Sequence, residues 1–565
     1  MIISAKQALR RFHQDEEGAL ILFGLMLFVL MVMMGGFAVD LMRYENTRVK
    51  LQNTLDRCTL NAAALSQQLD RESVVRDCVK KAGLSDQLQN VTVTSGQNAT
   101  AVQTVGRADT RPMFLHMIGI EKFDAVGSSK AEQSISNLEI VLVLDVSGSM
   151  TGAKIANLKI AANQFVDTIL DNDPNHRASI SIVPYNAQVN IGPDLVSKFN
   201  ITHPNGVAND NCVEIPAGAF NSLALSQTDP MPMMAYADIA KVTDRGNYFV
   251  LPTNTTYAVP NYSSTFCKPS TVNVVRLPNN DRTVLKAQID ALQAGGNTSI
   301  TLGMKWGATL IDPAMRPVYT QFIGSGKIPG NIPDRPFAYD DDNSLKIIVL
   351  MTDGEHVAHK RVTDAFKSNL SPIYRSAADG AYSAFHASRI DTTSATTICD
   401  SRPFYLPQLG AWQARPWNGT TPGATDCYVG GETFGAVQQD WRDIWASMKM
   451  TYVAWQFYAR ALGTDPTTRT AVYNAVLDGT ATQPGMRATY AQVPQMDASL
   501  DQTCDLVKAS GVVVYGVAVE APINGQAVIS ACATSPRHYF EASAVGTVNA
   551  FSAIASNITM LKLTQ

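Results

Sequence analysis

Three oxygen-bearing side chains follow an apolar stretch of this chain on alternate residues. Residues 138–144 read LEIVLVL, and Asp145, Ser147 and Ser149 come directly after them. Gly148 lies between the two serines and permits a tight turn in which all three side chains face one point. Carboxylate and hydroxyl oxygens are ligands that Mg²⁺ or Mn²⁺ prefers, so the motif predicts a divalent cation site. An alternative stays open, in which Asp145 caps the next helix and the serines are ordinary turn residues.

The apolar stretch before Asp145 is a predicted parallel strand, because it is continuous and rich in β-branched residues, as a strand covered on both faces must be. An amphipathic helical pattern follows at 154–170. Similar apolar stretches, also accompanied by helical patterns, lie at 178–184, 345–351 and 512–519. This alternation predicts an α/β fold with a doubly wound, mainly parallel sheet. Ligands of such sheets bind beyond the carboxyl ends of the strands, where Asp145 falls.

The DxSxS motif resembles the metal-ion-dependent adhesion site of von Willebrand factor A domains. That family also uses a threonine from a second loop and an aspartate after a later strand. Thr298 in GGNTSITLGMKWG and Asp353 in IIVLMTDGE match these two positions. The resemblance implies that Ser147 and Ser149 ligate Mg²⁺ (or Mn²⁺) directly, and Thr298 directly or through water. Asp145 and Asp353 would act mainly through water, and a partner protein would supply an Asp or Glu to the open position.

An uncharged segment near the start of the chain, residues 18–39, is long enough to cross a membrane. A helix rises about 1.5 Å per residue, and the hydrocarbon layer is about 30 Å thick. A retained transmembrane helix is therefore predicted, with 1–17 as a cytoplasmic N-terminus. Two alternatives are a cleaved secretory signal and prepilin-type processing after Gly18, although Phe23 stands where such processing requires glutamate. Basic residues flank both ends, so charge does not give the orientation.

Helical spacing continues beyond this segment, and residues 40–83 are predicted to form a helical stalk. Asp70 is placed to cap a second, short helix. Alternating apolar residues around a turn at 96–98 predict a small β-rich unit over 84–136.

The remaining residues, 137–565, are assigned to the von Willebrand A-like domain. They exceed what that family requires, so two insertions are predicted, at about 187–282 and 357–494. The second insertion holds five of the six tryptophans. Exposed aromatic residues beside a metal loop suit a recognition surface. More often such residues form the core of the insertion itself, and that is the expectation here.

Eight cysteines follow the apolar segment, and this even number indicates disulfide bonds and an oxidising compartment. Their order along the chain predicts the pairs Cys58–Cys78, Cys212–Cys267, Cys399–Cys427 and Cys504–Cys532. The first pair requires a helical hairpin, because one straight helix would hold the two residues about 30 Å apart. Eight reduced thiols remain the alternative. The bulk of the chain is accordingly expected outside the cytoplasm.

The segment around the membrane helix resembles the N-terminus of the TadE/TadG-type proteins of bacterial tight-adherence (Flp) pilus machines. The likeness rests on Gly18 before the span, Val39 and Asp40 at its end, Gln52, and Asp56 before an alanine run. It implies a single-pass protein of the bacterial inner membrane with its bulk in the periplasm. It also implies a role in Flp pilus assembly or anchoring, with a pilus-machine component as the partner.

The sequence contains few features that indicate nucleic-acid binding, phosphate binding or zinc binding. A formal net charge of -4 gives no sign of the basic face that nucleic acid requires. The GSGK at 324–327 lacks the phosphate-loop pattern, and the EHVAH at 355–359 is predicted to be a solvated turn instead of a zinc motif. The sequence therefore predicts a metal-dependent binding protein and no enzyme. A surface adhesin or matrix-binding protein is the alternative, and a metal-dependent hydrolase is less favoured.

Overall fold

The computed structural model describes residues 17–64, 69–95, 99–134, 137–173, 175–239, 260, 267–341, 344–390, 401–423, 426–427 and 434–559. The expected turn at 96–98, Cys399 and nearly all of the expected cytoplasmic N-terminus lie outside these residues. The chain forms two compact units, one containing the described residues up to 134 and the other running from Asn137 to Thr559.

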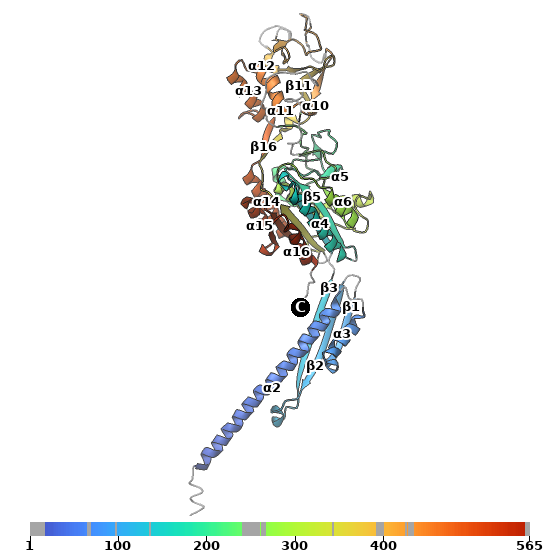
Figure 1. Ribbon diagram of the computed structural model, residues 1–565, viewed down its shortest axis with the longest axis vertical. Coiled ribbons are helices and arrows are strands. Elements are labelled where there is room, and N and C mark those ends of the chain that lie inside the picture. The colour runs from blue at the N-terminus through green and yellow to red at the C-terminus, as the bar shows by residue number, and fades with distance from the viewer. Residues whose placement is uncertain are drawn as a thin grey trace, which may run out of the picture. The chain divides into compact units, whose positions relative to one another are not determined.

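The first unit combines a long helix with an antiparallel sheet. Helix α2 (Glu17–Ala63) runs unbroken from the apolar segment into the predicted stalk. Its second half lies along the sheet, as Figure 1 shows. Leu51 and Leu55 of this half belong to the core that it shares with the sheet. The strands lie in the order β1 (Leu88–Ser95), β2 (Ala99–Thr110) and β3 (Phe123–Ser134). Among the described residues, α2 is the helix with the length and composition to cross a membrane.

Helix α3 (Arg71–Lys81) completes the predicted helical hairpin. Its N-cap is Asp70, whose carboxylate accepts a hydrogen bond from the Ser73 N–H at 2.9 Å, in agreement with the sequence prediction. The short 3₁₀ helices η1 (Ser85–Gln87) and η2 (Leu115–Ile118) precede β1 and β3.

The second unit is built around a sheet in the order β18-β17-β9-β4-β5-β8. Its parallel strands are β4 (Asn137–Asp145), β5 (Ala178–Tyr185), β9 (Ser344–Thr352), β17 (Val513–Val519) and β18 (Tyr539–Ala542). The edge strand β8 (Arg276–Asn279) pairs antiparallel with β5. It falls inside 187–282, so part of the predicted first insertion belongs to the central sheet. This strand escaped prediction because its four residues contain no continuous apolar run.

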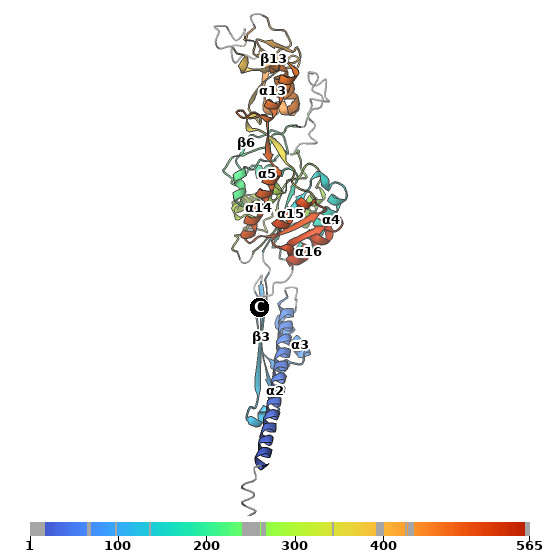
Figure 2. The same cartoon turned by 90° about the vertical axis from the view of Figure 1, so that its left-hand side faces the viewer.

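Helices cover both faces of this sheet, as Figure 2 shows for α4, α14, α15 and α16. Successive residues of β4 point to opposite faces, with Val141 and Val143 in one core and Ile140 and Leu142 in the other. The first core includes α7 (Ile300–Ile311), α14 (Val493–Ala509) and α15 (Ile523–Cys532), and α8 (Arg316–Gly324). The second includes α4 (Ala153–Asp171), α6 (Arg282–Asp290) and α16 (Thr547–Thr559).

The described residues of the first insertion contain little regular structure. They include α5 (Gly192–Val196) and the paired short strands β6 (Ile201–Thr202) and β7 (Met231–Pro232). The second insertion has a five-stranded antiparallel sheet of β11 (Leu370–Ser376), β12 (Tyr382–Phe385), β13 (Phe404–Leu406), β14 (Ala411–Gln413) and β15 (Ala436–Asp440). Its described α-helices include α10 (Trp441–Ser447), α11 (Met450–Val453), α12 (Arg460–Leu462) and α13 (Pro466–Asp478).

Tryptophans of the second insertion lie inside it. Trp441 and Trp445 are buried and stack with ring centroids 5.0 Å apart, and Trp412, Trp417 and Trp455 are half-buried. Trp441 and Trp445 belong to the insertion's own core, and Trp455 and Trp417 pack against its core clusters, as expected from the sequence. The ribbon of β10 (His359–Val362) and β16 (Arg487–Ala491) carries the chain into and out of this insertion.

Candidate metal centre

The five predicted metal-site residues meet at the carboxyl edge of the six-stranded sheet. Asp145 is the last residue of β4, and Asp353 directly follows the neighbouring strand β9. Ser147 and Ser149 lie in the turn after β4, and Thr298 lies just before α7. Parallel strands end at the same edge of a sheet, and this topology brings together residues that are some 200 positions apart in the sequence.

Hydrogen bonds connect the oxygen atoms of this cluster. The Ser149 hydroxyl donates to Asp353 Oδ1 at 2.6 Å, and the Oγ atoms of Ser147 and Ser149 are 3.0 Å apart. Asp145 Oδ1 accepts the Ser147 backbone N–H at 2.8 Å. Thr298 lies next to Gly354, the residue after Asp353. Its Oγ1 is 3.1 Å from the position that a Cβ on Gly354 would occupy. Any side chain larger than glycine at residue 354 would crowd the Thr298 hydroxyl.

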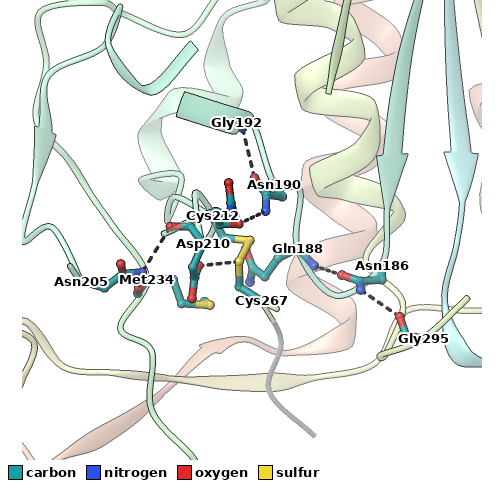
Figure 3. The surroundings of a disulfide bond; sticks show 11 residues. Asn186, Gln188, Asn190, Gly192, Asn205, Asp210, Cys212, Met234, Cys267 and Gly295 are labelled. Carbon is teal, nitrogen blue, oxygen red and sulfur yellow. Dashed lines mark hydrogen bonds between the residues drawn. A yellow bond between two sulfur atoms is a disulfide. The ribbon is translucent and has the colours of Figure 1, made fainter. Parts of the chain in front are cut away.

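Backbone hydrogen bonds join the loop before α7 to the DxSxS turn. The Gly148 N–H donates to the Gly296 carbonyl, and the Gly295 N–H donates to the Val146 carbonyl, both at 2.8 Å. Asn186 supports the same loop by donating from its side chain to the Gly295 carbonyl at 2.8 Å, as Figure 3 shows. Gly296 has a φ of +91°, which favours glycine, and a Cβ there would lie 2.8 Å from the Asn186 amide nitrogen. The two loops therefore hold each other in place.

The two carboxylates differ in their surroundings. Asp145 is fully buried, and this burial raises its pKa to about 6. Hydrogen bonds from Ser147 and from the Thr352 hydroxyl, 2.7 Å away, oppose the rise in pKa, while the charge of Asp353 adds to it. The second oxygen of Asp353 accepts a hydrogen bond from the Lys154 ammonium at 2.8 Å.

This donor set fits a hard divalent cation. Two carboxylates and three hydroxyls are gathered in one place, and nitrogen or sulfur ligands of the kind that zinc prefers are not part of the cluster. The alternative in which Asp145 caps the next helix is wrong, because the N-cap of α4 is Gly152 and no side chain caps it. The serines lie in a turn, and their hydroxyls face each other and Asp353.

Three residues of the site were not predicted from the sequence: Thr352, Lys154 and Asn186. Asn186 directly follows β5, so the reasoning that found Asp145 at the end of its strand could also have found Asn186. Lys154 lies in the first turn of α4 and was read only as a helix residue. Its partner Asp353 is 199 positions away, and no local pattern indicates such a contact.

The expected solvated turn at 355–359 is wrong. His356 is only 4% exposed, and its Nε2 accepts the Thr301 backbone N–H at 3.1 Å. Its Nδ1 lies 2.6 Å from Asp497 Oδ1 on α14. Burial lowers the pKa of His356, and Asp497 opposes that effect in part. His356 therefore ties the loop after Asp353 to α7 and α14, and the backbone of His359 begins β10.

Three of the four expected disulfide bonds are present. They join Cys58 to Cys78, Cys212 to Cys267, and Cys504 to Cys532, with Cα–Cα distances of 5.6, 6.0 and 5.1 Å. The fourth, Cys399–Cys427, stays a prediction because Cys399 lies outside the described residues.

Figure 3 shows that Asp210 lies beside the Cys212–Cys267 disulfide, with one carboxyl oxygen 2.7 Å from Cys267 Sγ. The group has the spacing of a metal site. Both sulfurs are bonded to each other, however, and offer no thiolate to a metal. Burial raises the pKa of Asp210 to about 7.

Comparisons with known proteins find one family model that matches part of this chain and several solved structures of low similarity. Residues 18–65 match the family model Tad, described as Flp pilus-assembly TadE/G-like. A comparison with curated proteins gives no match. Among solved structures, the von Willebrand factor domain of the type V pili tip protein Mfa5 from Porphyromonas gingivalis is 12% identical, with a TM-score of 0.29, over 75% of this chain and 95% of that one.

Two further solved structures are similar at the same low level. The pilus adhesin SpaC from Lactobacillus rhamnosus GG is 10% identical, with a TM-score of 0.28, over 84% of this chain and 34% of that one. The PilB minor pilin from Streptococcus sanguinis is 11% identical, with a TM-score of 0.25, over 84% of this chain and 78% of that one.

Proposed function

We propose that this chain is a membrane-anchored, metal-dependent protein-binding component of Flp (Tad) pilus assembly or anchoring, and that it has no catalytic role. The match of residues 18–65 to the TadE/G-like family supports the pilus context. The apolar first half of α2 supports the anchor. The observation that carries the binding role is the meeting of five oxygen-bearing side chains from three loops at one sheet edge.

In this proposal the second unit is a von Willebrand A-like domain that holds Mg²⁺ or Mn²⁺. Ser147 and Ser149 bind the cation directly, Thr298 binds it directly or through water, and Asp145 and Asp353 hold its waters. When bound, the cation supplies a hard Lewis acid that takes a carboxylate oxygen from a partner's Asp or Glu. The Asn186-supported loop keeps Thr298 in position while the partner binds.

The partner is proposed to be a pilus-machine component. The chain is placed in the bacterial inner membrane through residues 18–39, with the bulk of the chain in the periplasm. The three disulfide bonds support an oxidising compartment for the parts that contain them, because such bonds are rare in the cytosol. A partner confined to the same membrane would be at high effective concentration, so a weak single contact would be sufficient.

Calorimetric titration of the full-length protein with Mg²⁺ tests the site. Asp145→Asn and Asp353→Asn keep the size of each side chain and remove its charge. We expect each to weaken Mg²⁺ binding about 10–100-fold, the range typical of groups that orient metal ligands. A matched control is Asp340→Asn with Asp341→Asn, which removes two charges just before β9 begins, at its amino end. Equal Mg²⁺ affinity in the site variants and the control would refute the metal site.

A further inference from the structure

The connection between β2 and β3 is fixed to α2 at the end of the apolar segment. Asp40 of α2 is 1% exposed, and its carboxylate accepts three backbone N–H groups from this connection. The donors are Met113 at 2.7 Å, Phe114 at 2.8 Å and Leu115 at 2.9 Å. One carboxylate thus binds the start of the 3₁₀ helix η2 to the long helix.

Gly36 provides a second point of attachment. It lies one helical turn before Asp40, on the same face of α2, and both residues are buried. A Cβ at residue 36 would lie 2.4 Å from Cγ of Phe114, so the aromatic ring rests directly against the helix backbone. The contacts at Gly36 and Asp40 together fix the position of the β2–β3 connection along the axis of α2.

The fixed connection exposes large apolar side chains. Met113 is 66% exposed, Met117 83% and Ile118 53%. They adjoin the first half of α2, whose apolar side chains from Leu20 to Val39 are also exposed. The two apolar surfaces meet where Phe114 rests against Gly36 and where Asp40 accepts the N–H groups of the connection. Arg111 stands before the connection and Glu121 and Lys122 stand after it, and the exposed His116 is the one titratable residue between them.

Helix geometry places this region at the edge of the hydrocarbon layer. Gly36 lies about 11 Å from the middle of residues 18–39 when each residue rises about 1.5 Å. Half of the hydrocarbon layer measures about 15 Å, so Phe114 reaches the outer part of that layer. A loop with apolar side chains at this level and charges at both ends has the composition of an interfacial membrane anchor.

We propose that residues 112–120 form a second membrane contact, a lipid-binding loop that inserts Met113, Met117 and Ile118 into the outer part of the bilayer next to α2. The inference rests on the proposed transmembrane anchor. Lipid is the occupant because the loop continues the surface that the transmembrane helix itself presents to lipid. This second contact would act as an interfacial anchor and hold α2 in one rotation about its axis, because such anchors help to set the rotation of a helix in a bilayer.

Fluorescent labelling of the full-length protein in phosphatidylcholine vesicles tests this loop. An environment-sensitive probe is attached to a cysteine introduced by Met117→Cys. Phe28→Cys places the same probe in the transmembrane segment, and Thr94→Cys places it at the exposed far end of β1. Thr94 pairs with Ala101, nine residues along β2 from Thr110, where the connection begins. We expect the emission at residues 117 and 28 to shift to the blue and to be quenched by brominated lipid, and that at residue 94 to do neither.

Results that differ from these expectations would overturn the lipid-binding loop, the anchor or both. Quenching at residue 28 without quenching at residue 117 would overturn the lipid-binding loop and leave the anchor intact. Failure at both positions would overturn the anchor and the loop together. A blue shift at residue 117 that brominated lipid does not quench would show that protein covers the loop instead of lipid. Adding Met113→Asp and Ile118→Asp should abolish the quenching at residue 117 while that at residue 28 in the matching variant persists.

Discussion

At the scale of residues, the candidate metal site combines atoms that the sequence could identify with contacts that it could not. Asp145, Ser147 and Ser149 were identifiable because residue type and spacing are local properties of the chain. Thr352 supports Asp145, and Lys154 neutralises part of the charge on Asp353, through contacts across about 200 positions. Those contacts depend on strand order in the sheet, which local patterns do not encode.

Asp210 leads to a prediction about pH and stability. Its Oδ2 is buried and has no hydrogen-bond partner among the described residues, and burial raises its pKa from 3.8 to about 7. In the unfolded chain the carboxyl loses its proton near pH 4, whereas in the folded chain it keeps it up to about pH 7. The unfolded state therefore binds fewer protons in this interval, and Asp210 lowers stability increasingly as the pH rises through it.

Asp210→Asn should accordingly raise the free energy of unfolding at pH 8 by about 2–4 kcal/mol, and by progressively less as the pH falls toward 4. Urea unfolding of the full-length protein at several pH values measures this. Asp173→Asn is the control, because both oxygens of that buried carboxylate accept backbone N–H groups, and its loss should lower stability. A gain at Asp210 that does not change with pH would contradict the explanation.

At the scale of elements, α7 shows how a helix can position a site. Each of its residues is buried, and two glycines face the sheet. A Cβ on Gly303 would lie 2.5 Å from the Tyr185 ring, and one on Gly307 would lie 2.7 Å from a Val143 methyl. The glycines let α7 lie close to the sheet, and Thr298 stands two residues before the helix begins.

Gly303→Ala should therefore affect both stability and metal binding. The added methyl group forces α7 or Tyr185 to move, which we expect to cost about 1–3 kcal/mol of stability. Movement of α7 displaces Thr298, so Mg²⁺ affinity should fall as well. Gly324→Ala at the end of α8 is the matched control, because nothing lies within 4 Å of its added Cβ. Unchanged Mg²⁺ affinity in Gly303→Ala would show that α7 does not position the site.

The hydrophobic pattern of each strand explains which strands could be predicted from the sequence. The stretches 138–144, 178–184, 345–351 and 512–519 correspond to β4, β5, β9 and β17, because buried parallel strands carry continuous apolar runs. The antiparallel sheet of the second insertion and the edge strand β8 were missed. β8, β13 and β14 have only three or four residues, and β8, β14 and β15 are partly exposed, so they lack a long continuous apolar run.

At the scale of the whole molecule, the two insertions are joined by a buried ion cluster. Glu214 of the first insertion accepts hydrogen bonds from Arg361 at 2.7 Å and Lys367 at 2.6 Å of the second. Burial raises the pKa of Glu214, and both cations oppose that rise. The cluster brings together residues about 150 positions apart, and no local sequence pattern predicts such contacts. Long insertions thus belong to the same compact unit as the metal-site loops.

The apolar helix α2 and the loops of the candidate metal site lie in different compact units, so their proposed contributions should be separable. A chain lacking residues 1–136 should fold and bind Mg²⁺ with the affinity of the full-length protein, because the described contacts of the site lie within the second unit. The same truncation should abolish pilus formation, since it removes the proposed anchor that would confine the protein with its partner at the membrane. The Asp145→Asn, Asp353→Asn double variant should remain in the membrane at normal levels and also lose pilus formation. Normal pili in cells with that stable double variant would show that the metal site is not how this protein holds its partner.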